Sequence, residues 1–132
     1  MANGPFASTR RSFLTDEIDY EDGDFLLLGV GAGYTYSIAH DVIDDLSDIL
    51  DTDVMVQTLV DEWFDADDNS LTVATGDTLR GLVIAQDTGD TATSKLVLFM
   101  DTNYLSETAI NRPGNDNAFP VRWPTGGIFR TR

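Results

Sequence analysis

The stretch that decides the fold is Leu79–Thr102, LRGLVIAQDTGDTATSKLVLFMDT. It holds two apolar runs, Leu82–Ala85 and Leu96–Met100, and each has the length and the residue types of a buried β-strand. A polar loop of threonines with Gly89 and Ser94 separates the runs, and these residue types favour turns. The stretch therefore predicts a β-hairpin at the centre of a small β-domain.

Short strands are also predicted on both sides of this hairpin. Apolar or alternating runs mark the strands, and Pro120 restricts the last of them to the edge of a sheet. This pattern predicts a mainly β fold, an antiparallel β-sandwich or barrel-like domain of about six or seven short strands. The expected strands beside the hairpin include Phe25–Val30, Val54–Val60 with an extension as far as Phe64, Leu71–Ala74 and Phe119–Trp123.

One or two short helices are expected beside the strands. Apolar residues spaced three or four apart indicate helical turns over Arg10–Ile18 and a helix over Ala39–Leu50, with Ser37 as its N-terminal cap. Residues 1–9 are small and turn-rich, which predicts a flexible or partner-bound arm. Residues 10–132 are expected to form a single β-rich domain, because a chain of 132 residues is long enough for one core and too short for two.

The charge of the chain is strongly asymmetric. The net charge is −15, and the segment from Ser12 to Leu79 holds eighteen acidic residues and no Lys or Arg, whereas six basic and five acidic residues follow from Arg80 onward. A field of this sign repels nucleic-acid phosphates and anionic membranes, so neither is expected as a partner. Two interpretations stay open. The acidic half keeps the protein soluble, as in a saline environment, or it meets the basic C-terminal part of another copy.

Composition also limits the chemistry of the chain. It has no Cys and a single histidine, His40, which argues against disulfides, thiolate sites and multi-histidine metal centres. No apolar run approaches the roughly 20 residues that span a bilayer. The first residues, MANGPFASTRRSF, lack the apolar core of a signal peptide. We therefore expect a soluble, unprocessed protein.

Two motif-like patterns fail the requirements of the sites that they resemble. The run Gly29–Gly33 has the wrong spacing for a dinucleotide loop, and no Lys lies near it to hold a phosphate. Asp65–Asn69 begins like a calcium loop, but Ser70 and Gly76 stand where that loop requires Gly and Glu. A strand-ending turn and a polar turn are the expected structures, and a loose cation site elsewhere among the carboxylates stays an alternative.

Catalytic side chains are not indicated by the remaining polar clusters. Ser37, His40 and Asp41 are close in sequence, whereas a catalytic triad is assembled from distant segments. Neighbouring acids such as Asp44–Asp45 and Asp61–Glu62 usually repel each other on a solvated surface. We therefore predict no enzyme activity, no cofactor and no catalytic or metal-binding residue.

Contacts with other proteins are expected near the two ends of the chain, where Arg and aromatic residues occur together. Arg and Trp are favoured at the centres of protein interfaces, and Trp123 between exposed-type positions fits an intersubunit anchor. A homo-oligomer is the expected assembly. The candidate interface residues are Phe6, Arg10, Arg11, Arg112, Phe119, Arg122, Trp123, Phe129, Arg130 and Arg132.

Several short motifs follow one another in a fixed order along the chain. They are Tyr34–Asp41 (YTYSIAHD), Asp44–Leu46 (DDL), Phe64–Asp68 (FDADD), Leu82–Ile84 with Asp87–Gly89 (LVI, DTG), Ala92–Lys95 (ATSK) leading to Asp101–Thr102, and Pro113–Gly114, Val121–Trp123 and Gly126–Phe129 (PG, VRW and GGIF). In order and spacing they resemble a family of small structural proteins of tailed-bacteriophage virions, from about Tyr20 to Phe129. The segment before Phe64 is shorter and more acidic than in that family, which leaves strand pairing there open.

The resemblance implies a virion protein that is assembled in the host cytoplasm and has no catalytic residues. The expected place is on the capsid, as a decoration or cement protein that bridges subunits of the major capsid protein. A neck or tail accessory protein or fibre adaptor, with neck or tail proteins as partners, is the first alternative. A small carbohydrate- or metal-binding module for adsorption is the second, and its aromatic residues would be Tyr34, Tyr36, Trp63 and Trp123.

Overall fold

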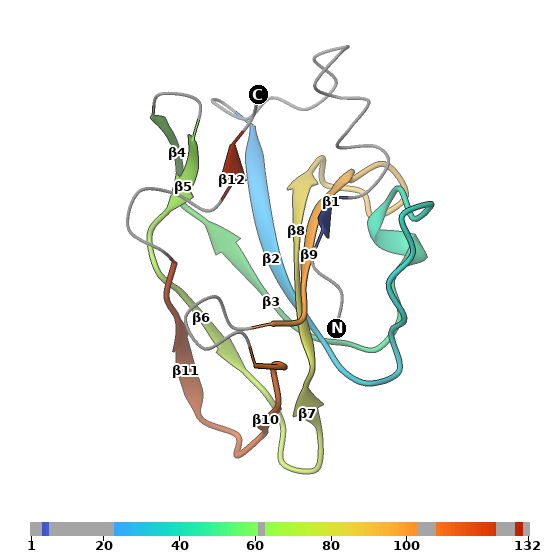
Figure 1. Cartoon of the computed structure of the whole chain (residues 1–132), viewed down its shortest axis with the longest axis vertical. Helices are drawn as coiled ribbons and strands as arrows, with labels where there is room; N and C mark the ends of the chain where they lie inside the picture. The colour runs from blue at the N-terminus through green and yellow to red at the C-terminus, as the bar shows by residue number, and fades with distance from the viewer. Residues whose placement is uncertain (1–3, 6–22, 61–62, 103–107, 124–128, 131–132) are drawn as a thin grey trace.

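The computed structural model describes residues 4–5, 23–60, 63–102, 108–123 and 129–130. In this part of the chain all strand pairs are antiparallel and one 3-10 turn is present, which confirms the predicted mainly β fold (Figure 1). The elements are β1 (Gly4–Pro5), β2 (Asp24–Val30), η1 (Ile43–Asp45), β3 (Ile49–Met55), β4 (Gln57–Val60), β5 (Trp63–Ala66), β6 (Asn69–Thr72), β7 (Thr78–Leu79), β8 (Gly81–Asp87), β9 (Leu96–Met100), β10 (Arg112–Pro113), β11 (Ala118–Val121) and β12 (Phe129–Arg130).

The largest sheet has five strands in the order β1-β9-β8-β2-β3 (Figure 1). The predicted hairpin is its β8–β9 pair, in which Val83 lies opposite Phe99 and Ile84 opposite Leu98. β2 lies between β8 and β3, with Leu27 opposite Ile84. The stretch that predicted the hairpin therefore supplies two of the three inner strands of this sheet.

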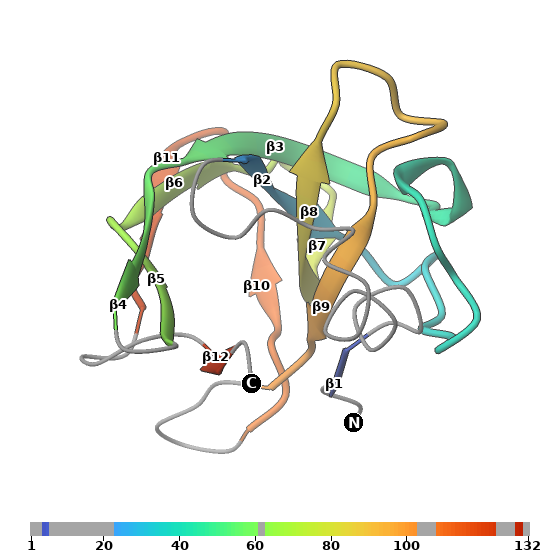
Figure 2. The same ribbon diagram turned by 90° about the horizontal axis from the view of Figure 1, so that it is seen from above.

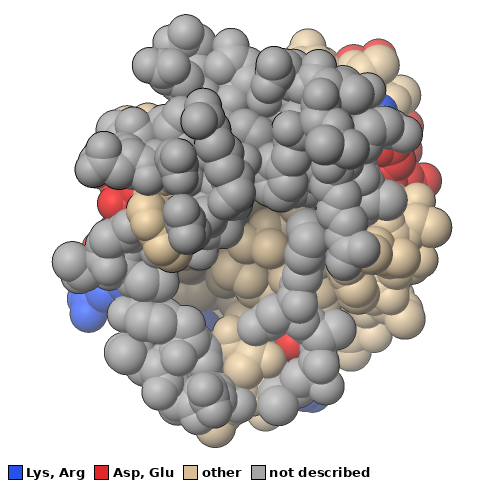
Figure 3. All heavy atoms as spheres, turned by 45° about the horizontal axis from the view of Figure 1, so that its top comes forward, with Lys and Arg blue, Asp and Glu red and all other residues tan. Residues whose placement is uncertain are grey.

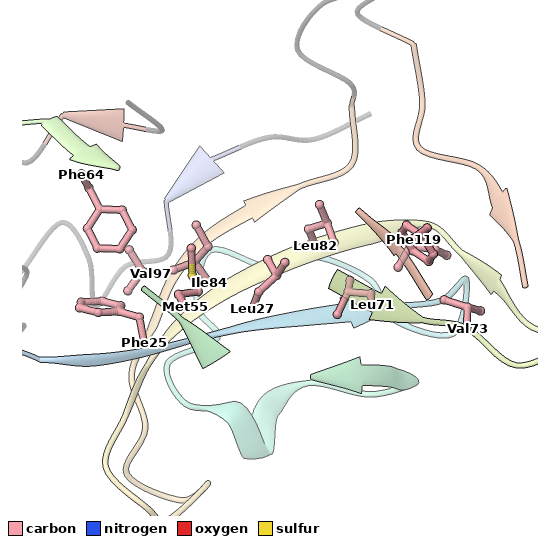
Figure 4. Close-up of a cluster of buried hydrophobic side chains, with 11 residues drawn as sticks. Phe25, Leu27, Met55, Phe64, Leu71, Val73, Leu82, Ile84, Val97 and Phe119 are labelled. Carbon is pink, nitrogen blue, oxygen red and sulfur yellow. The ribbon is translucent and has the colours of Figure 1, made fainter. Parts of the chain in front are cut away.

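The apolar runs of these strands are continuous because both faces of the sheet are buried. Side chains point to alternate faces along a strand. Phe25 and Leu27 of β2 enter one hydrophobic cluster, while Leu28 and Val30 enter a second. The first cluster fills the interior of the domain (Figure 4). Its buried members are Phe25, Leu27, Met55, Phe64, Leu71, Val73, Leu79, Leu82, Ile84, Val97 and Phe119.

Three small sheets complete the wall around the first cluster. They are the pairs β6–β11 and β7–β10 and the three-stranded sheet β4–β5–β12, and Figure 2 shows them curving around the same interior as the large sheet. Phe64, Leu71 and Phe119 reach the cluster from these strands, so the sheets form one β-sandwich-like domain. β11 contains Pro120 and pairs with β6 alone among the described strands, which confirms the predicted edge strand.

The helix predicted over Ala39–Leu50 is wrong. Ile43–Asp45 forms only a 3-10 turn, and β3 begins at Ile49. Asp48 has a left-handed backbone, with φ of 55°, which ends a helical run before β3. The apolar spacing misled the prediction because these residues do not form one helical face. Ile43 enters the second cluster, and Leu50 packs against the first.

The strand predicted from Val54 to Phe64 is folded back on itself. β3 ends at Met55, and β4 pairs with β5 so that Leu59 lies opposite Phe64. Asn69 begins β6, so Asp67–Asp68 is all that remains of the predicted polar turn. These bends give the described part eight strands of four or more residues and four two-residue strands, more than the expected number.

The N-terminal predictions fall mostly outside the described residues. Gly4–Pro5 of the predicted arm forms β1, which pairs with β9 of the same chain. The rest of the arm and the helical turns predicted over Arg10–Ile18 are not in the described part.

Candidate functional site

Four of the candidate interface residues lie in or beside β10 and β11. Arg112 is exposed, and its guanidinium carbon lies 4.0 Å from the centroid of the Phe119 ring. Phe119 itself is 7% exposed and belongs to the first cluster. Its side chain therefore stabilises the fold and presents little surface to a partner. Arg122 is exposed and directed away from this core, as an interface residue would be.

Trp123 is held by its own chain. It packs against the first cluster, and its indole N–H donates a hydrogen bond of 2.9 Å to Asn69 Oδ1. Asn69 is buried, and its amide nitrogen donates to Asp53 Oδ2 at 2.9 Å and to the Val54 carbonyl at 3.2 Å. The predicted intersubunit anchor is thus partly used inside the domain. Asn69 was missed as a key residue because the sequence shows it only as the end of an acidic turn.

Two carboxylates join β3 to β6, and we call this contact the carboxylate seam. Asp51 Oδ2 accepts a hydrogen bond from the Thr72 backbone N–H at 2.6 Å, and Asp53 Oδ2 accepts one from the Ser70 backbone N–H at 2.9 Å. The hydrogen bond from Ser70, followed by that from the Asn69 side chain, holds the pKa of Asp53 below its usual value. Acidic residues that the sequence presents as solvated surface therefore connect two sheets.

Among the other candidate interface residues, two have a described backbone. Phe6, Arg10, Arg11 and Arg132 lie outside the described residues. Phe129 and Arg130 form β12, whose backbone pairs with Phe64 and Trp63 of β5.

The loop between β8 and β9, Asp87–Lys95, is the hairpin tip, and it folds on itself. The Asp90 carbonyl accepts hydrogen bonds from the Thr93 and Ser94 backbone N–H groups and from the Ser94 hydroxyl, at 2.9 to 3.1 Å. Ser94 Oγ also accepts a bond of 3.0 Å from the Thr88 N–H. Ser94 is buried, and Gly89 has a φ of 86°, which glycine adopts without strain. The tip is therefore a fixed shape rather than a loose turn.

The hairpin tip contacts the segment Asp41–Leu46, which runs through η1. The Ile43 N–H donates to the Ser94 carbonyl at 3.1 Å, and the Leu96 N–H donates to the Asp41 carbonyl at 2.9 Å. Lys95 forms an ion pair with Asp41, with Nζ and Oδ2 2.9 Å apart. Two of the motifs that carry the family resemblance are thus in direct contact, although about 50 residues separate them in sequence.

The single histidine belongs to an aromatic cluster on the outer face of the large sheet. The Tyr34 hydroxyl and His40 Nδ1 are 2.8 Å apart and hydrogen-bonded, and burial raises the pKa of Tyr34 to about 12. The rings of Tyr34 and Tyr36 pack on Phe99, with centroids 5.7 and 5.1 Å away. Ser37 Oγ accepts the Ala39 backbone N–H at 3.2 Å, in a turn rather than at a helix start. These contacts hold Tyr34 and Tyr36 against the large sheet.

The glycine cluster is occupied by a carboxylate of the same chain. Asp48 Oδ2 accepts the Gly33 N–H at 2.8 Å, and the Asp48 carbonyl accepts the Gly31 N–H at 3.0 Å. A Cβ added at Gly31 would lie 2.3 Å from Asp48 Oδ2, so glycine allows this close approach. The run is a strand-ending turn, as predicted.

Neither a metal cluster nor a membrane-spanning helix is seen in the described residues. There, no three His, Cys, Asp or Glu side chains come close enough together to hold a metal ion. The helix search of the same residues finds none long and apolar enough to cross a bilayer. In the failed calcium loop, Asp65 Oδ1 accepts the following N–H of Ala66 at 2.8 Å, and Asp68 Oδ1 lies 3.4 Å from the Trp123 N–H.

Exposed apolar side chains lie at the end of β3, in the link to β4 and at the start of β5. Val54 is 67% exposed, Val56 62% and Trp63 38%, and we call these three residues the apolar stripe. On the face shown in Figure 3, Asp and Glu atoms gather at the upper right and Lys and Arg atoms are scattered. The apolar stripe and the exposed Arg122 are the features of the described surface that best fit contact with another protein. No family model, curated protein or solved structure matches the chain.

Proposed function

We propose that the protein is a non-enzymatic structural protein of a tailed-bacteriophage virion, acting as a decoration or cement protein that bridges neighbouring capsid subunits. The proposal rests on the ordered motifs from Tyr34 to Phe129 and on their resemblance to small virion proteins. Its partner is the major capsid protein, and its place is the particle surface.

The observation that carries the proposal is the contact between two of these motifs. The hairpin tip and the segment Asp41–Leu46 meet through backbone hydrogen bonds and one ion pair. Residue types that serve catalysis elsewhere are engaged in the fold here, since His40 bonds to Tyr34 and the Ser94 hydroxyl bonds within the tip. These motifs stabilise a rigid shape and do not build a reactive centre. A structural protein requires this.

The mechanism follows from linkage between binding and assembly. A protein that binds only where capsid subunits adjoin stabilises the assembled shell, because its binding free energy is absent from the separated subunits. A rigid β-domain suits this task, since little conformational entropy is lost when it binds. The acidic surface then faces solvent and keeps the protein soluble.

Electron microscopy of the intact particle tests the proposal. A decoration protein is expected as repeated density over the capsid surface, with hundreds of copies per particle by quantitative gel densitometry. Density at the neck or tail, with a copy number of tens or fewer, would replace it with the accessory-protein alternative. Absence of the protein from purified particles would overturn both.

A further inference from the structure

The side chains of the apolar stripe point outward, as their exposure and their buried neighbours show. Met55 points into the first cluster, so Val54 and Val56 on either side of it point outward. Phe64 also points inward, so Trp63 before it shares the outer face. Two valines only one residue apart that are each more than 60% exposed are unusual, because burying them would release free energy.

Acidic residues line one side of the apolar stripe. The Asp67 backbone N–H donates to the Val56 carbonyl at 3.0 Å, which places Asp67 directly across from Val56. Asp65 is two residues from Trp63 on β5, so these two side chains share one face, and Asp67 follows in the turn after this strand. Two stripes brought face to face would bring these carboxylates together. The occupant of the stripe must therefore offer apolar contact with positive charge beside it.

The outer face of β11 has this chemistry. Phe119 points into the core, so Ala118 and Pro120 point outward, and both are exposed. Arg122 follows in the same alternation and is exposed as well. This row joins a small apolar surface to a guanidinium at the edge of a sheet.

We infer that the apolar stripe of one copy docks on the outer face of β11 of a second copy. Figure 1 places β4 and β5 at the upper left and β11 at the lower left, along one side of the molecule. A two-fold rotation then brings each stripe to the β11 of the other copy and makes two identical contacts, as in a closed dimer. Asp67 of each copy faces Arg122 of the other, and the valines cover Ala118 and Pro120.

Sedimentation of the purified full chain over a range of concentrations tests this dimer. At about 0.15 M salt the Debye length is about 8 Å, so repulsion between two chains of net charge −15 is screened. The expected mass at high concentration is twice the 14.5 kDa of the monomer. Val54→Asp should weaken the dimer by more than about tenfold, because it places a charge inside an apolar contact. The matched control is Ile38→Asp, another exposed apolar residue outside the stripe, which should leave the dimer intact.

A charge exchange tests the pairing itself. Asp67→Arg and Arg122→Asp should each weaken the dimer, and an equal mixture of the two variants should restore it, because one contact is then reversed and the other is native. Circular dichroism checks that each variant is folded. A chain that stays monomeric at every concentration overturns the inference. So does equal loss with Val54→Asp and Ile38→Asp, or a mixture that does not recover.

Discussion

Two of the contacts outside the strand ladders of this domain are made by different chemical groups. The hairpin tip contacts Asp41–Leu46 through backbone N–H and carbonyl groups, with one partly exposed ion pair. The carboxylate seam between β3 and β6 depends on the side-chain oxygens of Asp51 and Asp53 as acceptors. An exposed ion pair contributes little to stability, so the first contact depends mainly on neutral groups and the second on charge.

The difference explains how a chain of net charge −15 uses its acidic residues. Most carboxylates add repulsion, but a carboxylate that accepts backbone N–H groups is stabilised by them. β3 and β6 belong to different sheets, and at the carboxylate seam side chains make the hydrogen bonds between them. We therefore expect the seam to weaken in acid.

The largest expected effect follows from removing the residue at the centre of the seam. Asn69→Ala deletes the hydrogen bonds to Asp53, the Val54 carbonyl and Trp123 at a buried position. The free energy of unfolding should fall by about 2–4 kcal/mol, because buried partners lose their hydrogen bonds. Urea unfolding followed by Trp fluorescence measures the change.

The neighbouring residue supplies the control for this variant. Ser70→Ala keeps the backbone N–H that bonds Asp53, and its side chain is exposed, so stability should change by less than about 0.5 kcal/mol. If both variants lose the same free energy, the amide network is not what joins β3 to β6.

The hairpin tip should respond less strongly to the loss of its buried hydroxyl. Ser94→Ala removes the acceptor for the Thr88 N–H and the donor to the Asp90 carbonyl. We expect a loss of about 1–2 kcal/mol and, by hydrogen exchange, faster exchange confined to the tip and to η1. Thr91→Ala, an exposed change in the same loop, should leave exchange unchanged. Uniform faster exchange in Ser94→Ala would show that the tip is not a separate unit.

The sequence predicts a contact well only when its partners lie close together along the chain. The β8–β9 hairpin and the turn signal of its loop are local, and the apolar runs predict them correctly. The helix predicted at Ala39–Leu50 fails because its apolar residues serve two clusters on opposite faces of a sheet. No local pattern marks Asp53 or Asn69, because the partner of each lies about 16 residues away, across a pair of strands.

The same limit applies to the candidate interface. Arg and aromatic residues near the end of the sequence indicate where contacts gather, but burial separates Phe119 and Trp123 from Arg122. The apolar stripe was missed because Val54 and Val56 look like ordinary strand residues. Only the direction of Met55 shows that they face outward.

The acid dependence of stability is the next effect in size. The folded pKa of Asp53 lies below the unfolded value of about 3.9, so its contribution is present above that value. It is lost as the pH falls through the folded pKa, when the carboxylate becomes protonated. In Asp53→Asn the unfolding free energy should be lower than in the wild type near pH 7, and this difference should shrink in acid.

Unfolding midpoints in urea between about pH 7 and pH 2.5 measure this difference. Asp44→Asn, at an exposed carboxylate in η1, is the control and should follow the wild-type pH profile. A difference between Asp53→Asn and the wild type that is constant with pH would mean that the seam does not depend on the charge of Asp53.

The smallest effect concerns Arg112, which brings positive charge to the side of the domain that holds the seam. Its guanidinium carbon lies 4.0 Å from the centroid of the Phe119 ring, a cation–π geometry at an exposed site. Arg112→Ala should therefore lower the unfolding free energy by about 0.5–1 kcal/mol, whereas Arg122→Ala should have no measurable effect on the monomer. Thermal unfolding of dilute protein compares the two variants. If both variants are equally stable, Phe119 is held by burial alone. Charge then contributes to stability on this side of the domain only at the carboxylate seam.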